Sequence, residues 1–421
     1  MHYVIIGAGP AGINAAEHLR KYNPDSSITL LRAENVPPYS RMALPYFLAD
    51  NIKAEGTYLR KNEKHFDKLG IDIRQGRASA IDTTAKRVDL LGGDTLNYDK
   101  LLIASGATAT RPPIPGIDLD GVHNCWSIAD AQKIIAGTKA GSRVILMGAG
   151  FIGCIILEAL AARKVDLTVI EMESRMVSRM TNEPMGNMIK TWCESKGIKV
   201  LTSTRVDEIT DSSGSALAVK TNTGETLAAD MIICATGVRS NTAFLDGSGI
   251  EVDMGIVVDD YLQTSAVDVY AAGDVAQGRD LSTGEYYVQA IQPTAVEHGK
   301  ISAQNMAFGN TTSHAGNLNM NVLDTVGLIS TSFGLWMGVD GGEVAEMSDP
   351  ERFKYLNLQF KDDVLVGASS LGMTQHVGVM RGLIQTGAHL GEWKNKLLME
   401  PNRLAEAYLA SAQSLDSQLT A

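Results

Sequence analysis

A glycine-rich segment that occurs twice constrains the fold of this chain more than any other feature. The sequence VIIGAGPAG begins at Val4 and VILMGAGFIG begins at Val144, so each copy is an apolar run followed by G-A-G-x-x-G. Such a run is typical of a buried parallel strand, and the Ala- and Leu-rich stretch behind each copy is typical of a helix. A strand, a glycine turn and a helix in this order form the part of a doubly wound α/β fold that holds a dinucleotide.

The spacing of the glycines indicates how each copy holds a pyrophosphate. Gly7 permits the tight turn out of the strand, Gly9 lets a phosphate approach the backbone, and Gly12 lets the helix pack closely on the strand. The N-terminus of the helix offers N–H groups and a positive dipole end to the phosphates. The residues expected at the two sites are Gly7, Gly9, Pro10, Ala11 and Gly12 in the first copy, and Gly148, Gly150, Phe151, Ile152 and Gly153 in the second.

An acidic residue follows each copy, near the end of a second apolar run. A carboxylate at this place accepts hydrogen bonds from a ribose diol. Glu171 comes directly after the run LTVI, and we expect it to bind the ribose of the second nucleotide. Around the first copy, Arg32 directly follows the run and Glu34 comes two residues later, so the pattern leaves both as alternatives for the first ribose.

Length and charge limit the class of protein and its partners. A chain of 421 residues can form two or three domains, and a charged fraction of 20% is ordinary for a globular protein. The net charge of −11 argues against nucleic acid or an anionic membrane as the main partner. Residues 144–162 are almost all apolar, but the glycine motif and Glu158 within them favour a strand–turn–helix over a membrane span.

The cysteines indicate a reducing compartment and no metal centre. The four cysteines, at positions 125, 154, 193 and 234, show neither a disulfide pattern nor ligand spacing, and the eight histidines are scattered. Because the first strand begins almost at Met1, no signal peptide is expected before it. We therefore expect a cytoplasmic protein.

Further short motifs follow the two glycine turns in a fixed order. They are ASG at 104–106, ATG at 235–237 and YAAGD at 270–274, and the segment PPYSRMALPYFL lies at 37–48. With GAGPAG and GAGFIG, this set resembles the pyridine nucleotide–disulfide oxidoreductase superfamily, over residues 1–310. The branch that it resembles contains NADH–rubredoxin and ferredoxin reductases and the FAD module of nitrite reductase. The chain also resembles the FAD subunits that act as NAD reductases in multi-subunit aldehyde and 2-oxoacid oxidoreductases.

The resemblance implies an architecture and two cofactors, FAD and NAD(H). The expected fold class is α/β, with an FAD-binding domain (1–115 and 241–317) into which an NAD-binding domain (116–240) is inserted, both Rossmann-like. A C-terminal α+β domain (318–421) is expected to expose Trp336, Trp393 and Tyr408 and to dock a partner or a second copy of the chain. Besides the glycine turns, the resemblance implies that FAD is bound by Glu34, Arg41, Ala78, Ala104, Ser105, Gly106, Arg111, Gly273 and Asp274, and NAD by Glu171 and Gly237.

Two departures from the family pattern bear on function. Many relatives carry a redox-active cysteine after the first βαβ unit, but this chain has none before Cys125. A glutamate that commonly lies near the nicotinamide is replaced by Ile155. Because hydride transfer between cofactors needs no protein acid or base, we expect no catalytic side chain.

The missing dithiol leaves the electron acceptor to be identified. We expect an FAD-dependent enzyme that passes electrons between NADH or NAD⁺ and an iron–sulfur protein, either a rubredoxin, a ferredoxin or a subunit of a larger complex. The alternatives are an NADH oxidase that uses oxygen and a flavoprotein with mainly an interaction role. The sequence leaves open the partner, the physiological direction, and whether the chain forms a homo-oligomer or joins a hetero-complex.

Overall fold

The computed structural model describes residues 1–62, 64–212 and 216–419. Its contacts divide the chain into two compact units. The first contains Met1–Thr108 and Val238–Asn317, and the second contains Ala109–Gly237 and Leu318–Ala421. The chain therefore leaves the first unit and returns to it, and we describe each unit by itself.

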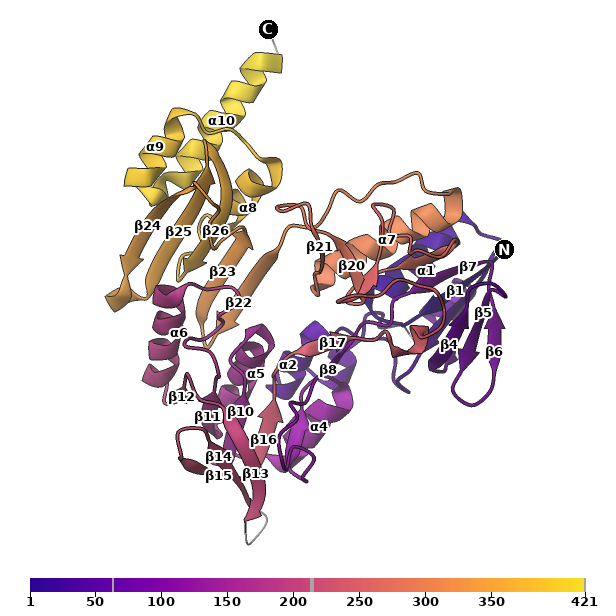
Figure 1. The fold of residues 1–421 in the computed structure, drawn as a ribbon, viewed down its shortest axis with the longest axis horizontal. Coiled ribbons are helices and arrows are strands. Elements are labelled where there is room, and N and C mark those ends of the chain that lie inside the picture. Colours follow the sequence, from indigo (N-terminus) through magenta and orange to yellow (C-terminus); the bar gives the residue numbers. More distant parts are fainter. Residues whose placement is uncertain (63, 213–215, 420–421) are drawn as a thin grey trace. The chain divides into compact units, whose positions relative to one another are not determined.

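The first unit is built on a five-stranded parallel sheet in the order β19-β7-β1-β2-β3. Two of these strands, β1 and β7, are labelled in Figure 1. The strands are β1 (His2–Ile6), β2 (Ser27–Arg32), β3 (Ile71–Gln75), β7 (Lys100–Ile103) and β19 (Val269–Ala271). Helix α1 (Pro10–Tyr22) packs closely against α7 (Gln292–Phe308), where Gly299 lies directly on Ala11. The smaller elements are α2 (Leu44–Leu48), α3 (His65–Lys68), the sheet of β4 (Ala78–Asp82), β5 (Arg87–Leu90) and β6 (Thr95–Asn97), the sheet of β18 (Ile256–Val257), β20 (Ala276–Arg279) and β21 (Tyr286–Val288), and the paired β8 (Ala107–Ala109) and β17 (Val238–Ser240).

The second unit repeats this sheet. Its order, β9-β16-β10-β11-β12, places the glycine-motif strand β10 where β1 lies in the first sheet, and again every pair of neighbours is parallel. The strands are β9 (Val122–Asn124), β10 (Arg143–Met147), β11 (Asp166–Ile170), β12 (Lys199–Leu201) and β16 (Met231–Cys234). Helices α4 (Ile128–Gly137), α5 (Phe151–Ala162) and α6 (Glu183–Ser195) accompany them, with a meander of β13 (Val206–Ser212), β14 (Ala216–Thr221) and β15 (Thr226–Ala229).

The C-terminal part of the second unit is an antiparallel sheet followed by helices. The sheet order is β22-β23-β26-β25-β24, and the strands are β22 (Met320–Thr325), β23 (Leu328–Gly334), β24 (Glu343–Asp349), β25 (Lys354–Lys361) and β26 (Val364–Leu371). Three helices follow: α8 (Val377–Thr386), α9 (Glu392–Met399) and α10 (Leu404–Leu419). The expected fold class, two Rossmann-like sheets and an α+β part, is confirmed. The three domain boundaries given above stay a prediction.

Side chains of α6 attach the C-terminal sheet to the Rossmann-like part of the second unit. The Trp192 indole N–H donates to the carbonyl oxygen of Val326 at 3.1 Å, and its ring meets that of Phe353 edge to face at 5.0 Å. The side-chain amide of Asn182, at the N-cap of α6, also donates to the hydroxyl of Tyr355. The C-terminal sheet is therefore packed against the helices α5 and α6 of its own unit.

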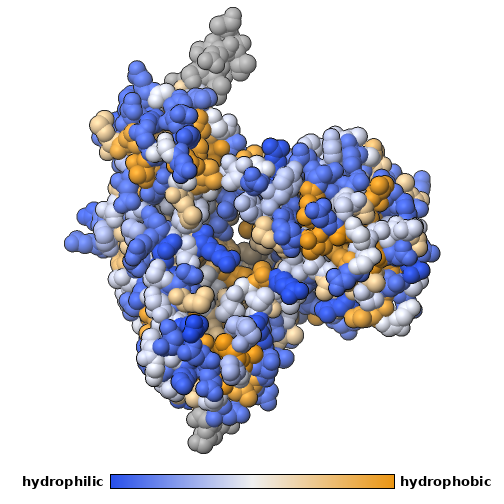
Figure 2. All heavy atoms as spheres, in the orientation of Figure 1, coloured by the Kyte–Doolittle hydropathy of each residue, from blue (hydrophilic) through white to orange (hydrophobic). Residues whose placement is uncertain are grey.

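The aromatic residues expected on the C-terminal surface are only partly exposed. Trp336 is buried, so for this residue the expectation is wrong. Trp393 is half-buried between the cations of Lys396 and Arg403, whereas Tyr408 is 44% exposed. Hydrophobic and hydrophilic residues are mixed over this part of the face drawn in Figure 2. Within the described ranges, no helix is long and apolar enough to cross a membrane.

We predict that the contact between α1 and α7 tolerates no added methyl group. A Cβ at Gly299 would lie 2.3 Å from the carbonyl oxygen of Ala11, so Gly299→Ala must push two helices apart. Overpacking of this kind costs about 1–3 kcal/mol. Gly382→Ala is the matched control, because a Cβ at this helical position meets no atom within 4 Å, and it should stabilise the protein by about 0.5–1 kcal/mol. Urea unfolding of both variants measures the difference, and equal effects would contradict the packing argument.

Candidate functional site

The first glycine turn leaves open space only at its middle glycine. A Cβ on Gly7 would lie 2.1 Å from the carbonyl oxygen of Ala104, and one on Gly12 would lie 1.9 Å from that of Gly7. A Cβ on Gly9 would meet nothing within 4 Å. Two glycines are therefore required by backbone packing, and the third faces a space that a phosphate can enter.

The second turn repeats the arrangement. A Cβ on Gly148 would lie 2.6 Å from the carbonyl oxygen of Ala235, and one on Gly153 would lie 2.1 Å from that of Gly148. The middle residue, Gly150, again faces open space. The ASG and ATG motifs thus serve the same purpose, because the alanine of each presses on the first glycine of its turn.

The helices behind the two turns leave their first N–H groups uncapped by side chains. Gly9 and Gly150 are the N-cap residues of α1 and α5, and the first turn of each helix contains no acidic residue. By contrast, α4 begins with a capping box between Ser127 and Asp130. Uncapped N–H groups at a helix N-terminus fit an anionic pyrophosphate.

Glu171 lies against the second turn. One of its carboxylate oxygens accepts the N–H of Ala149 at 2.6 Å, and the other accepts the N–H of Glu173 at 2.8 Å. These bonds fix the carboxylate beside the glycine motif, where the remaining lone pairs suit a ribose diol. The neighbouring Arg175 donates to the carbonyl oxygens of Thr181 and Ser178. Its guanidinium is therefore engaged with the backbone of its own loop.

Glu34, rather than Arg32, joins the polar network of the first unit. One Glu34 oxygen accepts from Arg41 at 2.8 Å, and the other accepts from the hydroxyl of Tyr39 at 2.8 Å. The guanidinium of Arg32 turns to the carbonyl oxygen of Val36 at 3.0 Å. Glu34 and Arg41 therefore lie next to each other, and the choice between Glu34 and Arg32 for the FAD ribose stays open as a prediction.

Asp274 is the residue best suited to a polyol in the first unit. It follows β19, and burial raises the pKa of its carboxyl group while the nearby Arg41 opposes the shift. Among the described residues, none donates a hydrogen bond to this carboxylate. A half-buried carboxylate without donors is costly unless a ligand supplies them, so the hydroxyls of a ribityl chain fit this position.

A residue that the sequence analysis missed fixes the ASG turn. The side-chain amide of Asn241 donates to the carbonyl oxygen of Ser105 at 2.9 Å, and the hydroxyl of Ser105 donates to the carbonyl oxygen of Asn241 at 2.9 Å. The N–H of Asn241 donates to the carbonyl oxygen of Gly106, which has a φ of +66°. Nothing in the sequence pattern marks Asn241, because its partners lie about 136 positions earlier.

Arg111 lies in the second unit and uses its guanidinium there. It donates to the side chains of Asn124 and Asp118 and to the carbonyl oxygens of Ile117 and Val122, at 2.9–3.0 Å. The contacts of Arg111 therefore give no support to its predicted role at FAD.

Two further residues predicted to bind a cofactor lie at a strand end and in a turn. Ala78 is a buried residue at the start of β4, and Gly237 forms a turn with a φ of +123° before β17.

The thiols are unsuited to redox chemistry. All four cysteines are buried, and burial raises the pKa of Cys125 and Cys193 to about 12 and that of Cys234 to about 11. The pKa of Cys154 is also raised well above its usual value. Because the thiolate is the nucleophile, these groups are inert at neutral pH. In the part of the chain that the structure describes, no cluster of His, Cys, Asp or Glu could hold a metal ion.

The positions near Ile155 offer no replacement for the missing glutamate. Ile155 is half-buried on α5, and the nearest acid along the helix, Glu158, interacts with Asp324 of β22. Burial and the Asp324 charge both raise the pKa of Glu158, which lies on the helix that packs against β22.

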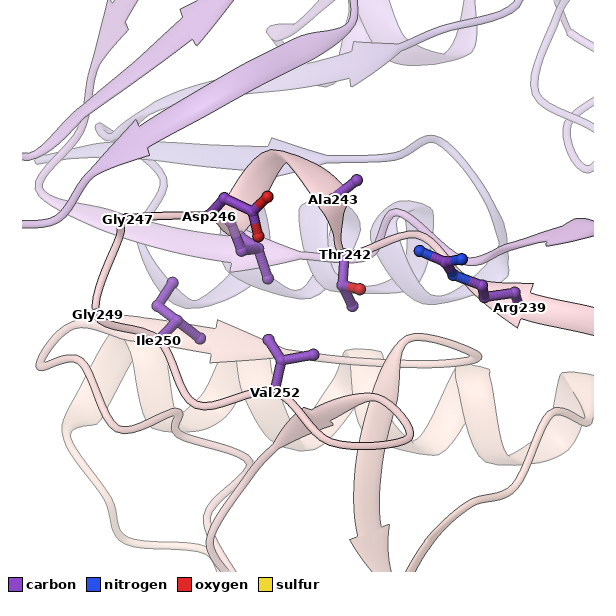
Figure 3. A pocket seen from close by; sticks show the side chains of 9 residues that line it. Arg239, Thr242, Ala243, Asp246, Gly247, Gly249, Ile250 and Val252 are labelled. Atoms are coloured by element: carbon purple, nitrogen blue, oxygen red, sulfur yellow. The ribbon is translucent and has the colours of Figure 1, made fainter.

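A separate hollow of about 350 Å³ lies in the first unit (Figure 3). Its lining includes the exposed Arg239 and the loop from Thr242 to Val252, and it contains none of the residues predicted to hold FAD or NAD.

Comparison with known proteins assigns the family. The model of the pyridine nucleotide-disulphide oxidoreductase family matches residues 1–299. The chain belongs to this family. Its members bind FAD and NAD(H), which agrees with the two glycine turns, Asp274 and Glu171. The protein is an NAD(H)-dependent flavoprotein oxidoreductase.

Three similar proteins illustrate the range of the family. The NADH-dependent phenylglyoxylate dehydrogenase subunit epsilon of Aromatoleum evansii is 30% identical over 402 residues, 95% of each chain. Rubredoxin-NAD(+) reductase of Pseudomonas putida is 28% identical over 91% of this chain and 99% of its own. The solved structure of an NAD-dependent persulfide reductase from A. fulgidus has a TM-score of 0.84 and 28% identity, covering 93% of this chain and 78% of that one.

We predict that Glu171 selects NADH over NADPH. Its carboxylate should accept from the 2′-hydroxyl and repel a 2′-phosphate, which is worth a few kcal/mol, roughly a 100-fold difference in kcat/KM. Glu171→Ala should lower kcat/KM for NADH about tenfold or more, so the preference for NADH over NADPH becomes smaller. The preference should not reverse, because the guanidinium of Arg175 is engaged with the carbonyl oxygen of Thr181. Glu173→Ala is the control, since this exposed neighbour contributes only its backbone N–H to Glu171. Comparable kcat/KM values for the two coenzymes in the wild type would contradict the prediction.

We also predict that electron transfer needs no thiol. A variant with Cys125, Cys154, Cys193 and Cys234 all changed to alanine should keep its FAD and reduce a dye with NADH within about twofold of the wild-type rate, since all four thiols are buried. Stopped-flow flavin reduction and dye reduction are measured on the same sample, with a melting curve to verify folding. Normal flavin reduction with lost transfer to the dye would show that a cysteine takes part.

Proposed function

We propose that this protein transfers electrons between NAD(H) and an iron–sulfur protein through FAD. The observation that carries the proposal is that the protein offers its flavin no thiol acceptor, because all four cysteines are buried and have raised pKa values. No metal-binding cluster exists among the described residues either. The electrons must therefore leave to a separate molecule.

The chemistry of the cofactors fits an iron–sulfur partner. Bound FAD accepts two electrons from NADH as a hydride and can release them singly to one-electron acceptors, while NAD⁺ and a proton are released. One similar protein supports this class of acceptor by its name, rubredoxin-NAD(+) reductase. Another is named as a subunit of an NADH-dependent dehydrogenase, which supports a role within a complex. The partner is therefore a rubredoxin, a ferredoxin, or an iron–sulfur subunit of a complex.

The residues of this chain bind and orient the two nucleotides. The turns at Gly9 and Gly150 receive the two pyrophosphates at uncapped helix N-termini. Asp274 accepts from the ribityl chain of FAD, and Glu171 accepts from the ribose of NAD(H). The apolar Ile155 occupies the place near the nicotinamide where relatives have an acid. No side chain gives or takes a proton in this scheme.

The similarity to a persulfide reductase does not extend to a thiol near the flavin. Reduction of a persulfide sulfur by way of a cysteine requires a thiolate near the flavin. The segment 35–48 contains Ser40 and Arg41 but no cysteine, and the hydroxyl of Ser40 is bound to Gln292 at the start of α7. We therefore place this chain with the reductases of separate electron carriers.

We propose that the C-terminal residues 318–421 serve assembly. The FAD domain is formed by residues 1–115 and 241–317, and the NAD domain by residues 116–240. The helices at the end of the chain present exposed apolar side chains, including Met399 at 79% and Leu409 at 60% exposure. Neither cofactor requires this part, since it contains no glycine turn and no ribose acid.

The test compares acceptors under identical conditions. The purified holoprotein with NADH should reduce a rubredoxin or a [2Fe–2S] ferredoxin anaerobically at least ten times faster than it consumes oxygen in air. Glutathione persulfide, the third acceptor, should be reduced no faster than in an enzyme-free control. Fastest turnover with oxygen would assign an NADH oxidase instead, and fastest turnover with the persulfide would contradict the proposal directly.

A further inference from the structure

A buried pair of histidines lies behind the YAAGD motif. His298 is on α7 and His314 is on the segment that follows it, and the two are 3% and 2% exposed. Their rings meet edge to face with centroids 4.7 Å apart. Nothing in the family assignment or in the proposed electron transfer uses these two residues, although both belong to the unit that contains Asp274.

The hydrogen bonds of His298 determine which ring nitrogen carries the proton. The N–H of Gly273 points to His298 Nδ1 at 3.4 Å, and because an N–H can only donate, Nδ1 must be unprotonated. His298 Nε2 then carries the proton and donates to the side-chain oxygen of Asn317 at 2.9 Å. The amide nitrogen of Asn317 donates in turn to Glu297 at 2.8 Å, which agrees with this assignment. The neutral Nε2–H form is thus the only one that satisfies the whole chain.

The long hydrogen bond from the Gly273 N–H to His298 lies directly before Asp274 in the chain. The Gly273 N–H is buried, and in the described part of the chain it donates to no other acceptor. Gly273 has a φ of +76° and is packed between Ala11 of α1 and Ala295 of α7. A buried N–H without an acceptor is costly, so the peptide would turn if His298 Nδ1 were lost, and Asp274 would turn with it.

We propose that His298 is a positioning residue for FAD: its neutral ring accepts the Gly273 N–H and so fixes the Ala272–Gly273 peptide, which places Asp274, the next residue, so that its carboxylate meets the ribityl chain. The inference rests on the flavin site of the proposed function but not on the identity of the electron acceptor. It adds a consequence for pH, because protonation of His298 would place an N–H against the N–H of Gly273.

Several charged groups surround the histidine pair. Glu297 lies on α7 itself, and Asp260 lies on the turn before β19, where its carbonyl oxygen accepts from the His314 N–H. The others are Arg279 and Asp280 at the end of β20, and Asp274 with Arg41 on the side of Gly273. In the described structure, the hydrogen bonds of the His298 ring go only to Gly273 and Asn317. No carboxylate therefore offsets a positive charge on His298 by direct contact.

The direction of the pH effect follows from this environment. Burial, with the neighbouring His314 as a second cause, lowers the pKa of His298 to about 3 from an ordinary value of 6.5. Burial also lowers the pKa of His314, whose Nε2 is buried without a hydrogen-bond partner. Because the pKa of His298 is lower in the folded than in the unfolded protein, the neutral ring contributes its full stability above pH 6.5. This contribution to the free energy of unfolding is lost as the pH falls from 6.5 towards 3. The free energy of unfolding should therefore fall on acidification over this range, while His298 in the folded protein stays neutral.

Two substitutions test the two ring nitrogens of His298 one at a time. His298→Asn places an amide oxygen where Nδ1 lies and cannot titrate, so it keeps the acceptor for Gly273. His298→Gln places its amide near Nε2, so it keeps the contact with Asn317 but loses that acceptor. His376→Gln, on the C-terminal domain, serves as the control.

The measurement is the dissociation constant of FAD between pH 4.5 and 8, with the visible spectrum and midpoint potential of the bound flavin. We expect His298→Gln to raise the Kd about tenfold and to shift the spectrum. His298→Asn should keep the Kd within about threefold of the wild-type value at pH 8, and its melting temperature, recorded over the same pH range, should fall less on acidification than that of the wild type. Wild-type values and an unchanged pH profile in both variants would overturn the proposal, as would equal damage in both.

A second measurement covers the case in which the variants do not fold. In the ¹⁵N NMR spectrum of histidine-labelled wild-type holoprotein at pH 7, His298 should be the neutral Nε2–H tautomer. An Nδ1–H tautomer or a cation would overturn the proposal. A wild-type protein that binds no FAD at any pH would instead contradict the flavin assignment itself, so the two failures are distinguishable.

Discussion

The close contact between a glycine turn and the backbone around it is the constraint on which the rest of this structure depends. In each copy the first glycine touches the carbonyl oxygen of an alanine from a neighbouring strand, and the last touches the carbonyl oxygen of the first. These contacts leave no room for side chains and draw the helix N-terminus over the end of the sheet. The middle glycine, Gly9 or Gly150, is then the one place where a ligand can reach the backbone.

The duplication of this contact explains why the molecule has two nucleotide sites. Both sheets have the same parallel order around the glycine-motif strand, so each provides a nucleotide site at the same topological position. The differences lie in the acids. Glu171 is fixed by two backbone N–H groups, whereas Glu34 is engaged with Tyr39 and Arg41. Asp274, which follows a strand far along the chain, is proposed to complete the first site.

Local spacing made much of this predictable from the sequence. The glycine turns, the strands before them and the helices behind them are encoded within about twenty residues, and the structure contains them at the expected places. The position of Glu171 is also local, because a strand that follows a glycine-turn helix runs parallel beside the first. The absence of a reactive thiol followed from residue positions alone, and the burial of all four cysteines agrees with it.

Contacts between distant residues account for what the sequence could not predict. The bond of Asn241 to Ser105, the attachment of Trp192 to Val326 and the network behind Gly273 all join positions that no spacing rule connects. The role of Arg111 at FAD stays a prediction, and the structure adds only that its guanidinium has four protein partners within the second unit. Trp336 was misplaced on the surface because an aromatic residue in a loop gives no local sign of its burial.

The central claim is that the flavin is the only redox centre of this chain. An anaerobic titration of the oxidised holoprotein with NADH tests it most directly, with the absorbance of the bound flavin as the readout. The account predicts complete bleaching with one equivalent of NADH per FAD, because each NADH delivers two electrons and no disulfide or sulfenic acid competes for them. A requirement for two equivalents before the flavin is fully reduced would reveal a second two-electron centre and contradict the account.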